Sequence, residues 1–408
     1  GRAGQQRLRL FGGLLREASH LPGEGARAGP VPDRRKFTLT PDVEAALSRL
    51  GISSQAIVDS AAATVGLGPG DTLLSVGSIA EGLSTSKSDV DLLLIRSGVT
   101  GADTNTTERS WLAERSWLAG RRVVDCKVIR SAEAGDLIRR LSTWAESPWN
   151  ITRGAGFNLE ERLLLHRLLR GHRLYPAHPG DSFRPAEDHL ARLKLQVARQ
   201  VARTIQVDMV GYRDNEDYAS LVFAAQELLG HAADGLLAGH RLTNPNLKWR
   251  SRLLGTLPAD WSQPLAIRPT RLPADRVYWQ LHRAPAEPDR AGALTHASLC
   301  TTFARALFAW AEPRLVPDSA IDVVPLPRSN DDQPTGRRLP SLEFDVDFRI
   351  RDGRATLARL NEFGGSLEVS DREFAVLLRC DGQTTAAEAE CDPRLVELAS
   401  KAGLWSRP

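Results

Sequence analysis

In the first third of the chain, the spacing of hydrophobic residues alternates between the period of a helix and that of a strand. Helical spacing predicts four helices, over residues 41–50, 54–65, 107–118 and 132–144. Apolar runs rich in β-branched residues predict three strands, over residues 71–76, 90–95 and 121–129. One or two helical turns are expected between the first two strands. This order predicts a small mixed sheet backed by helices.

The middle of the chain has the pattern of a helical domain. Its longest periodic segments are residues 159–169, 189–210 and 218–237. A polar segment at residues 238–249 interrupts the pattern and predicts a loop. We therefore expect a bundle of long helices after the mixed sheet.

The last part of the chain returns to strand periodicity. Apolar and polar residues alternate strictly over residues 342–350, as expected for a half-buried strand. The alternation puts Asp345 and Asp347 on the polar side, and we interpret this pair as a solvent-exposed strand face. The predicted fold class is α+β, with an N-terminal extension, a mixed-sheet core, a helical domain, a linker and a C-terminal domain at residues 1–36, 37–150, 151–325, 326–340 and 341–408.

Composition and charge narrow the classes of function. The chain has 408 residues, of which 42% are hydrophobic and 25% are charged, as in globular proteins. A net charge of +3 is too small to indicate non-specific binding of nucleic acid, which is therefore not an expected partner. No apolar run approaches the roughly 20 residues that span a bilayer, so no membrane partner is expected either. The first residues lack the apolar segment of a secretory signal.

The cysteines indicate a reducing compartment. None of the four forms a CxxC pair or a Cys/His cluster, so structural zinc is not expected. Cys126 is expected to be buried on its strand as an apolar residue. Scattered cysteines of this kind predict a cytoplasmic protein. The other three are Cys300, Cys380 and Cys391.

The most informative segment is residues 77–94, GSIAEGLSTSKSDVDLLL. Asp89 and Asp91 stand two residues apart at the start of an apolar run, a spacing that puts both carboxylates on one face of a strand. Two adjacent carboxylates repel each other unless a cation lies between them, and Mg²⁺ prefers carboxylate oxygens. Gly77 allows a close backbone approach, and Ser78 offers a hydroxyl and backbone N–H groups to phosphate oxygens. The segment therefore predicts a site for a nucleoside triphosphate and its metal.

These residues resemble the motif of the nucleotidyltransferase superfamily, which includes DNA polymerase β and the antibiotic nucleotidyltransferases. The family motif is Gly-Gly or Gly-Ser, a short spacer, an acidic-apolar-acidic triplet on a strand, and a third carboxylate on a later strand. Asp125, in the strand predicted at residues 121–129, can supply the third carboxylate. The resemblance covers residues 40–146 and implies a polymerase-β-like core, followed by a helical domain of the antibiotic-nucleotidyltransferase type.

The resemblance implies a Mg²⁺-dependent transfer of an NMP, AMP from ATP in the simplest case, to a hydroxyl of an acceptor, with release of pyrophosphate. Gly77 and Ser78 would cradle the phosphates of the nucleotide. The catalytic residues and metal ligands would be Asp89, Asp91 and Asp125. The lysines that could neutralise charge on the phosphates are Lys87, Lys127 and Lys248.

The C-terminal domain resembles a second family. The sequence LLRCDGQTT, residues 377–385, is similar to small winged-helix domains of peptide-natural-product pathways, among them the peptide chaperone of pyrroloquinoline quinone biosynthesis. This resemblance implies a winged-helix-like domain that binds a peptide, DNA or a neighbouring part of its own chain.

Several functions stay open at this point. The acceptor could be a small molecule, such as an antibiotic, or a ribosomally made peptide. A cyclic-dinucleotide synthase or a protein-AMPylating enzyme would share the same core motif. The alternative from another class is a non-catalytic scaffold that uses its winged helix for recognition of a peptide or DNA.

Overall fold

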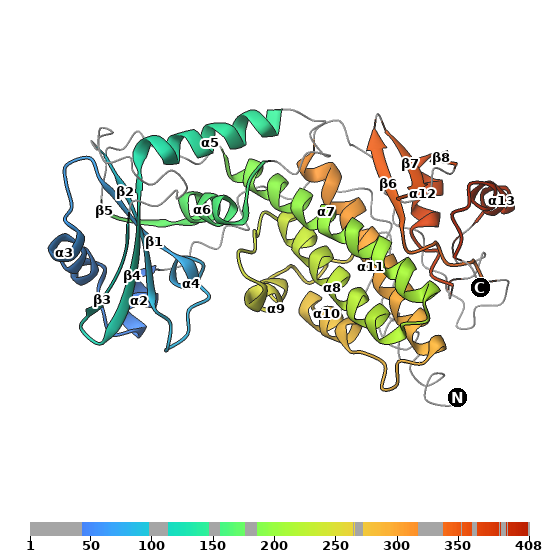
Figure 1. The fold of residues 1–408 in the computed structure, drawn as a ribbon, viewed down its shortest axis with the longest axis horizontal. Coiled ribbons are helices and arrows are strands. Elements are labelled where there is room, and N and C mark those ends of the chain that lie inside the picture. The colour runs from blue at the N-terminus through green and yellow to red at the C-terminus, as the bar shows by residue number, and fades with distance from the viewer. Residues whose placement is uncertain are drawn as a thin grey trace, which may run out of the picture. The chain divides into compact units, whose positions relative to one another are not determined.

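The computed structural model describes residues 43–97, 113–146, 156–175, 186–263, 265, 272–316, 338–351, 353–360, 365–382, 384, 389 and 391–406. They divide into two compact units, one that ends at Leu190 and one that starts at Ala191 (Figure 1). Each unit contains helices and its own sheet, so the predicted α+β class is confirmed at this level. The predicted N-terminal extension and most of the predicted linker at residues 326–340 lie outside the described residues.

A five-stranded sheet forms the centre of the first unit. β2 and β4 are parallel, and the other neighbouring pairs are antiparallel. The sheet extends past residue 150, the predicted end of the core, because its last edge strand comes later in the chain. In spatial order the strands are β3 (Ala113–Ala119), β4 (Arg122–Arg130), β2 (Val90–Arg96), β1 (Thr72–Val76) and β5 (His172–Tyr175).

One face of this sheet packs against helices α2 (Val43–Arg49) and α3 (Ser54–Val65) (Figure 1). Leu92, Val124 and Cys126 lie on this face and belong to the same buried cluster as the two helices. Burial raises the pKa of the Cys126 thiol to about 11. The prediction that Cys126 is a buried apolar residue is therefore confirmed.

The opposite face is partly covered by α5 (Ser131–Glu146) and α6 (Leu159–Arg170). Helix α5 contacts β2 and β4, whereas α6 contacts β1. Leu93 and Ile129 alternate with the residues of the first face and are also buried. A short helix, α4 (Gly77–Ala80), follows β1 directly.

Strand β3 shows that the helix predicted over residues 107–118 is wrong from residue 113 onwards; residues 107–112 lie outside the described part of the chain. β3 and β4 form a hairpin whose turn contains Gly120 with φ 63°, a conformation that favours glycine. Trp117 packs towards α3, and its indole N–H donates a hydrogen bond of 3.1 Å to the Ser60 hydroxyl. The hydrophobic residues of this segment fit the spacing of a helix as well as that of a strand, so pairing with β4 decides which structure forms.

Five helices dominate the second unit, and two of them contain the helical segments predicted at residues 189–210 and 218–237. Two of the long helices, α8 and α11, approach each other closely: the Phe308 and Trp310 rings occupy the space that side chains at Gly235 and Gly239 would fill. None of the described helices is long and apolar enough to cross a membrane. The helices are α7 (Glu187–Asp214), α8 (Tyr218–Gly239), α9 (Arg250–Leu254), α10 (Ala274–His282) and α11 (Arg290–Leu315).

The C-terminal part of this unit is an antiparallel three-stranded sheet followed by helices. A capping box begins the first of these helices: the Ser370 hydroxyl accepts from the Glu373 backbone N–H, and the Glu373 carboxylate accepts from the Ser370 N–H. In chain order the elements are β6 (Val346–Arg351), β7 (Arg354–Arg359), β8 (Leu367–Val369), α12 (Asp371–Leu377) and α13 (Pro393–Lys401).

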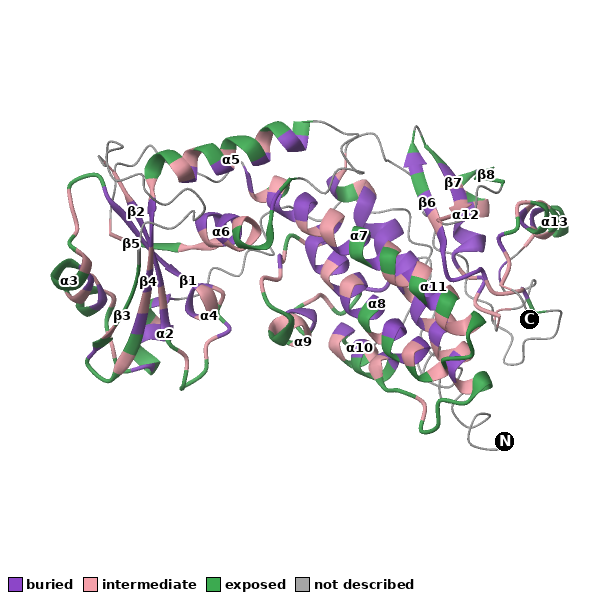
Figure 2. Cartoon of the chain, viewed as in Figure 1, coloured by how far each residue is buried: buried purple, intermediate pink, exposed green. Residues whose placement is uncertain are grey.

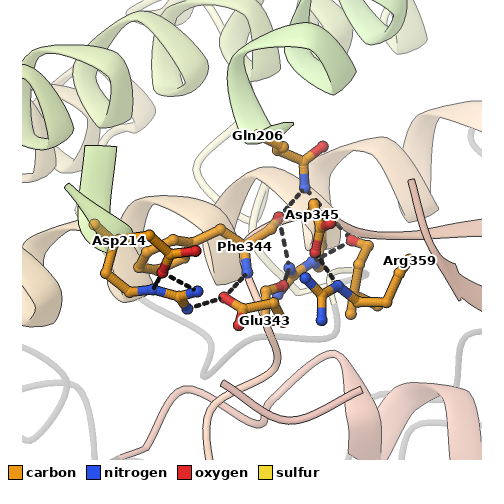
Figure 3. Close-up of polar contacts among 9 residues, drawn as sticks. Gln206, Asp214, Glu343, Phe344, Asp345 and Arg359 are labelled. Atoms are coloured by element: carbon orange, nitrogen blue, oxygen red, sulfur yellow. Dashed lines mark hydrogen bonds and ion pairs between the residues drawn. The ribbon is translucent and has the colours of Figure 1, made fainter. Parts of the chain in front are cut away.

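The interpretation of Asp345 and Asp347 as a solvent-exposed face is wrong. Asp345 is 1% exposed and its carboxylate is bonded to Arg359 (Figure 3). Asp347 is held by Arg203 at 2.6 Å and Arg199 at 3.3 Å, both from helix α7. The alternation of residues was identified correctly, but the polar side of the strand faces arginines instead of water.

The outer edge of β6 is closed by side chains of the helices. Backbone carbonyls at alternate positions point away from β7 and accept hydrogen bonds from long side chains on α7 and α11 (Figure 3). A strand edge normally offers unpaired carbonyls to another strand, and here side chains already occupy three of those carbonyls. The carbonyls belong to Phe344, Val346 and Phe348, and the donors are Gln206, Arg199 and Arg305.

Candidate active site

A row of paired residues crosses the five-stranded sheet at the level of the predicted carboxylates. Val76 on β1 pairs with Asp91 on β2, Asp91 pairs with Asp125 on β4, and Asp125 pairs with Ser116 on β3. Residues paired in register project to the same side of a sheet, and adjacent strands lie about 4.8 Å apart. The structure therefore places the Asp91 and Asp125 side chains as neighbours on one face.

Gly77 lies at the β1 end of this row, immediately after Val76. Its φ is 67°, and the carboxylate of Asp91 occupies the place where a Cβ atom would be, with the Asp91 Cγ 3.0 Å from that position. Glycine is required here for two reasons, the backbone conformation and the close approach of Asp91. The Gly-Ser segment and the first strand carboxylate thus meet in space.

We expect Gly77→Ala to displace the Asp91 carboxylate and to destabilise the first unit. Gly51→Ala is the matched control, because Gly51 has φ 77° but nothing within 4 Å of an added Cβ. The control should cost about 1 kcal/mol in unfolding free energy from backbone strain alone. Gly77→Ala should lower the unfolding free energy by about 1 kcal/mol more than the control, as measured by urea denaturation. Equal losses of unfolding free energy in the two variants would contradict the close contact with Asp91.

Ser116 was not identified from the sequence, because its segment was predicted as a helix. Its hydroxyl donates a hydrogen bond of 2.5 Å to Oδ1 of Asp125. This bond holds Oδ1 of the carboxylate towards β3. The only signal that could have found Ser116 is Gly120, which marks the hairpin turn four residues later.

Asp89 and Lys87 lie in the loop between α4 and β2, and both are exposed. The loop is fixed from within, since the Thr85 backbone N–H donates to the Ser88 hydroxyl at 2.8 Å. It is also fixed from outside, since Arg122 donates to the Ser86 carbonyl at 2.8 Å. Asp89 therefore stands directly ahead of β2, at the end of an anchored loop.

The other two candidate lysines have different surroundings. Lys127 lies two residues after Asp125 on the same strand and forms an ion pair with Glu114 at 3.7 Å. Lys248 belongs to the other compact unit, where its ammonium group lies 5.2 Å from the centre of the Trp249 ring. The structure thus brings Lys127, but not Lys248, into the unit that contains the carboxylates.

A buried pair behind the Gly77 turn was also missed. Glu81 directly follows α4, and its carboxylate lies 2.7 Å from Nε2 of His166 on α6. The two side chains are 7% and 4% exposed. Since Glu81 N–H also donates to the Gly77 carbonyl, the pair ties the Gly77 turn to α6. No sequence spacing links two residues so far apart.

The residues present suit Mg²⁺ in their chemistry. All three candidates are carboxylates, and the absence of a side chain at Gly77 gives Asp91 its place on the site face. Among the residues that the structure describes, no group of three or more His, Cys, Asp or Glu is already gathered as a metal site. The site consists of two adjacent carboxylates, Asp91 and Asp125, with Asp89 two residues upstream.

Comparison with known proteins gives no further guide to the site. No protein-family model matches the chain, and no match is found among curated proteins or solved structures. Any function assigned to the chain therefore has to rest on the residues and geometry described above.

Proposed function

We propose that the chain is a Mg²⁺-dependent nucleotidyltransferase that moves an NMP, AMP from ATP in the first instance, to an acceptor hydroxyl. The observation that carries the proposal is the row from Gly77 through Asp91 to Asp125. A segment that can approach phosphate closely lies beside one carboxylate, and a second carboxylate follows on the next strand. Transfer of a phosphoryl group needs such positioning and charge stabilisation more than a covalent nucleophile.

In the proposed reaction the acceptor oxygen attacks the α-phosphorus of the nucleotide. The bond from the α-phosphorus to the bridging oxygen breaks, and pyrophosphate leaves with that electron pair. Oδ2 of Asp125 accepts the proton of the acceptor, because Oδ1 is already bonded to Ser116. Gly77 and Ser78 hold the departing phosphates through backbone N–H groups and the hydroxyl.

Asp89, Asp91 and Asp125 would hold Mg²⁺, which when bound offsets the charge on the triphosphate. Lys127 would contribute a further positive charge on the same face, where its ion pair with Glu114 is exposed and therefore weak. Lys87 would do so from the loop ahead of β2.

The first test is nucleotide binding. Mg²⁺-ATP should raise the melting temperature, because a ligand that binds only the folded state stabilises it. Ser78→Ala should weaken binding by about 1 kcal/mol, or about fivefold in Kd, through loss of one phosphate contact. Ser48→Ala, which removes an exposed hydroxyl on α2, is the control and should leave the shift unchanged. A full shift in Ser78→Ala would move the phosphate site elsewhere, and no shift with any NTP would contradict nucleotide binding.

Two other reactions would use the same core, and their products distinguish them. A cyclic-dinucleotide synthase would convert NTP alone into a product with two phosphodiester bonds, and a protein-AMPylating enzyme would add the mass of AMP to a protein. Mass spectrometry after incubation with each NTP, with and without added proteins, separates these products from transfer to a small molecule or peptide.

A second function, peptide recognition by the C-terminal sheet, is favoured by the asymmetry of its two edges. The β6 edge is closed by Gln206, Arg199 and Arg305. The other edge strand of this sheet is β8 (Leu367–Val369), to which an extended peptide could add as a further strand. Peptides selected by display on the whole chain should protect the β8 amides from hydrogen exchange. Protection of other residues instead would contradict this function, and protection of α13 by duplex DNA would indicate DNA binding.

A further inference from the structure

The row of paired residues begins on β1, beside Gly77, and ends on β3, at Ser116. These two ends assign the leaving group and the acceptor to different places on the sheet. This step rests on the proposed function. If the phosphates lie at Gly77 and Ser78, the leaving pyrophosphate lies towards β1. In an in-line displacement the acceptor oxygen enters from the side opposite the leaving group. The acceptor therefore lies on the other side of Asp91, over Asp125 and Ser116, on the β3–β4 hairpin.

The surface beside Asp125 on that hairpin is apolar. Leu118 and Val123 are register partners, each two residues from Ser116 and Asp125 along its own strand, so they lie on the same face. They are 68% and 40% exposed. Exposed residues of the β3–β4 hairpin are green in Figure 2. Among the described residues of the first unit, only one other large hydrophobic side chain, Leu159, is exposed. Single exposed hydrophobic residues need no explanation, but this is an adjacent pair next to a candidate catalytic carboxylate.

The surface in the opposite direction along the same two strands is charged. Glu114 and Lys127 are register partners and form an ion pair at 3.7 Å, two residues beyond Ser116 and Asp125. The hairpin thus offers three zones in order: an apolar pair, the Ser116–Asp125 hydrogen bond, and a charged pair. A molecule that places its hydroxyl at Asp125 contacts apolar side chains on one side of that hydroxyl.

We propose that Leu118 and Val123 determine the acceptor, which is an alcohol carrying an apolar group next to the reacting hydroxyl. Residues two apart in a strand are separated by about 6.7 Å. An aromatic ring or short alkyl chain two or three carbons from the hydroxyl spans that distance. A polycationic sugar has no such apolar group to place on this pair.

The test uses 2-phenylethanol as the apolar probe and glycerol as the polar one. The full chain is labelled in Leu and Val methyl groups, saturated with Mg²⁺ and a non-hydrolysable ATP analogue, and followed by methyl NMR. Signals of Leu118 and Val123, assigned from their loss in Leu118→Asn and Val123→Thr, should shift with 2-phenylethanol and stay in place with glycerol. The Leu159 signal should not move with either alcohol.

The Kd for 2-phenylethanol should rise about tenfold in Leu118→Asn and stay unchanged in the matched variant Leu159→Asn. The inference is overturned if the Leu118 and Val123 signals do not shift, if glycerol shifts them equally, or if Leu118→Asn binds the probe as tightly as the wild type. It is also overturned if sedimentation shows a dimer that Leu118→Asn dissociates while probe binding is unchanged, since the pair would then contact a second copy.

Failure of the proposed function would look different. In that case Mg²⁺-ATP would neither raise the melting temperature nor release pyrophosphate with any acceptor, whatever the methyl signals show. If Mg²⁺-ATP binds and pyrophosphate is released with glycerol as readily as with 2-phenylethanol, the proposed function survives and only the assignment of the acceptor fails.

Discussion

Asp91→Asn and Asp125→Asn are each expected to lower nucleotidyl transfer by about three orders of magnitude. A bound divalent ion contributes several kcal/mol to stabilisation of transition-state charge, and about 4 kcal/mol corresponds to this factor. Folding should change little, because Asn has the same shape and the Oδ1 of residue 125 can still accept from Ser116. The measurement is pyrophosphate release from NTP at saturating Mg²⁺, alongside thermal unfolding of each variant.

Asp136→Asn provides the matched control for this loss. Asp136 is an exposed carboxylate on α5 of the same unit and forms an exposed ion pair of 2.6 Å with Arg139. Its replacement removes one negative charge without touching the row of paired residues, so turnover should be that of the wild type. Near wild-type turnover in Asp91→Asn or Asp125→Asn would show that these carboxylates do not hold the metal.

Asp347→Ala should destabilise the second unit by about 3–5 kcal/mol. The substitution removes the carboxylate that Arg199 and Arg203 share, although Arg199 keeps its ion pair with Glu312. Removal of one partner of a buried ion pair has this cost. Glu368→Ala, on β8 of the same sheet, is the matched control because its ion pair with Arg354 is exposed and should contribute less than about 1 kcal/mol. Urea denaturation of the two variants should separate them clearly; similar losses would contradict a buried role for Asp347.

The same carboxylate predicts how stability depends on pH. Burial alone would raise the pKa of Asp347, but the charges of Arg199 and Arg203 outweigh burial and lower it below its ordinary value. Because the folded-state pKa lies below that of the unfolded chain, about 3.9, the stabilisation is complete above that pH. It is lost as the pH falls from there through the folded-state pKa. This acid-dependent part of the unfolding free energy should be absent from Asp347→Ala.

The position of the candidate site could be predicted because its parts are local in sequence. Gly77, Ser78, Asp89 and Asp91 fall within fifteen residues. Periodicity puts Asp125 on a later strand, and the resemblance to a known motif, not periodicity, singled it out as the third carboxylate. The partners of these residues could not be predicted. Ser116 reaches Asp125 only through the hairpin, and His166 reaches Glu81 only because α6 packs against the sheet.

The errors in the predicted fold have one physical origin. In β3, the residues are compatible with a helix, and pairing with β4 decides the outcome. In the segment at Asp345 and Asp347, the period was correct, but periodicity tells which residues share a face and not what covers it. Asp345 is covered by Arg359 on the next strand, and Asp347 by Arg199 and Arg203, which lie more than 140 residues earlier in the chain; the local pattern contains no information about these partners.

The partners in these contacts lie far apart in the sequence, and this separation constrains when the second unit can fold during synthesis. Helix α7 leaves the ribosome well before residues 343–348, whose carboxylates and carbonyls are the partners of Arg199, Arg203 and Arg213. During synthesis from the N-terminus these arginines remain hydrated, because they cannot be buried until their partners have emerged. The helices can form early, but their final packing waits for the last part of the chain. The second unit therefore completes its folding only when translation is nearly finished, whereas the contacts of the first unit are all available much earlier.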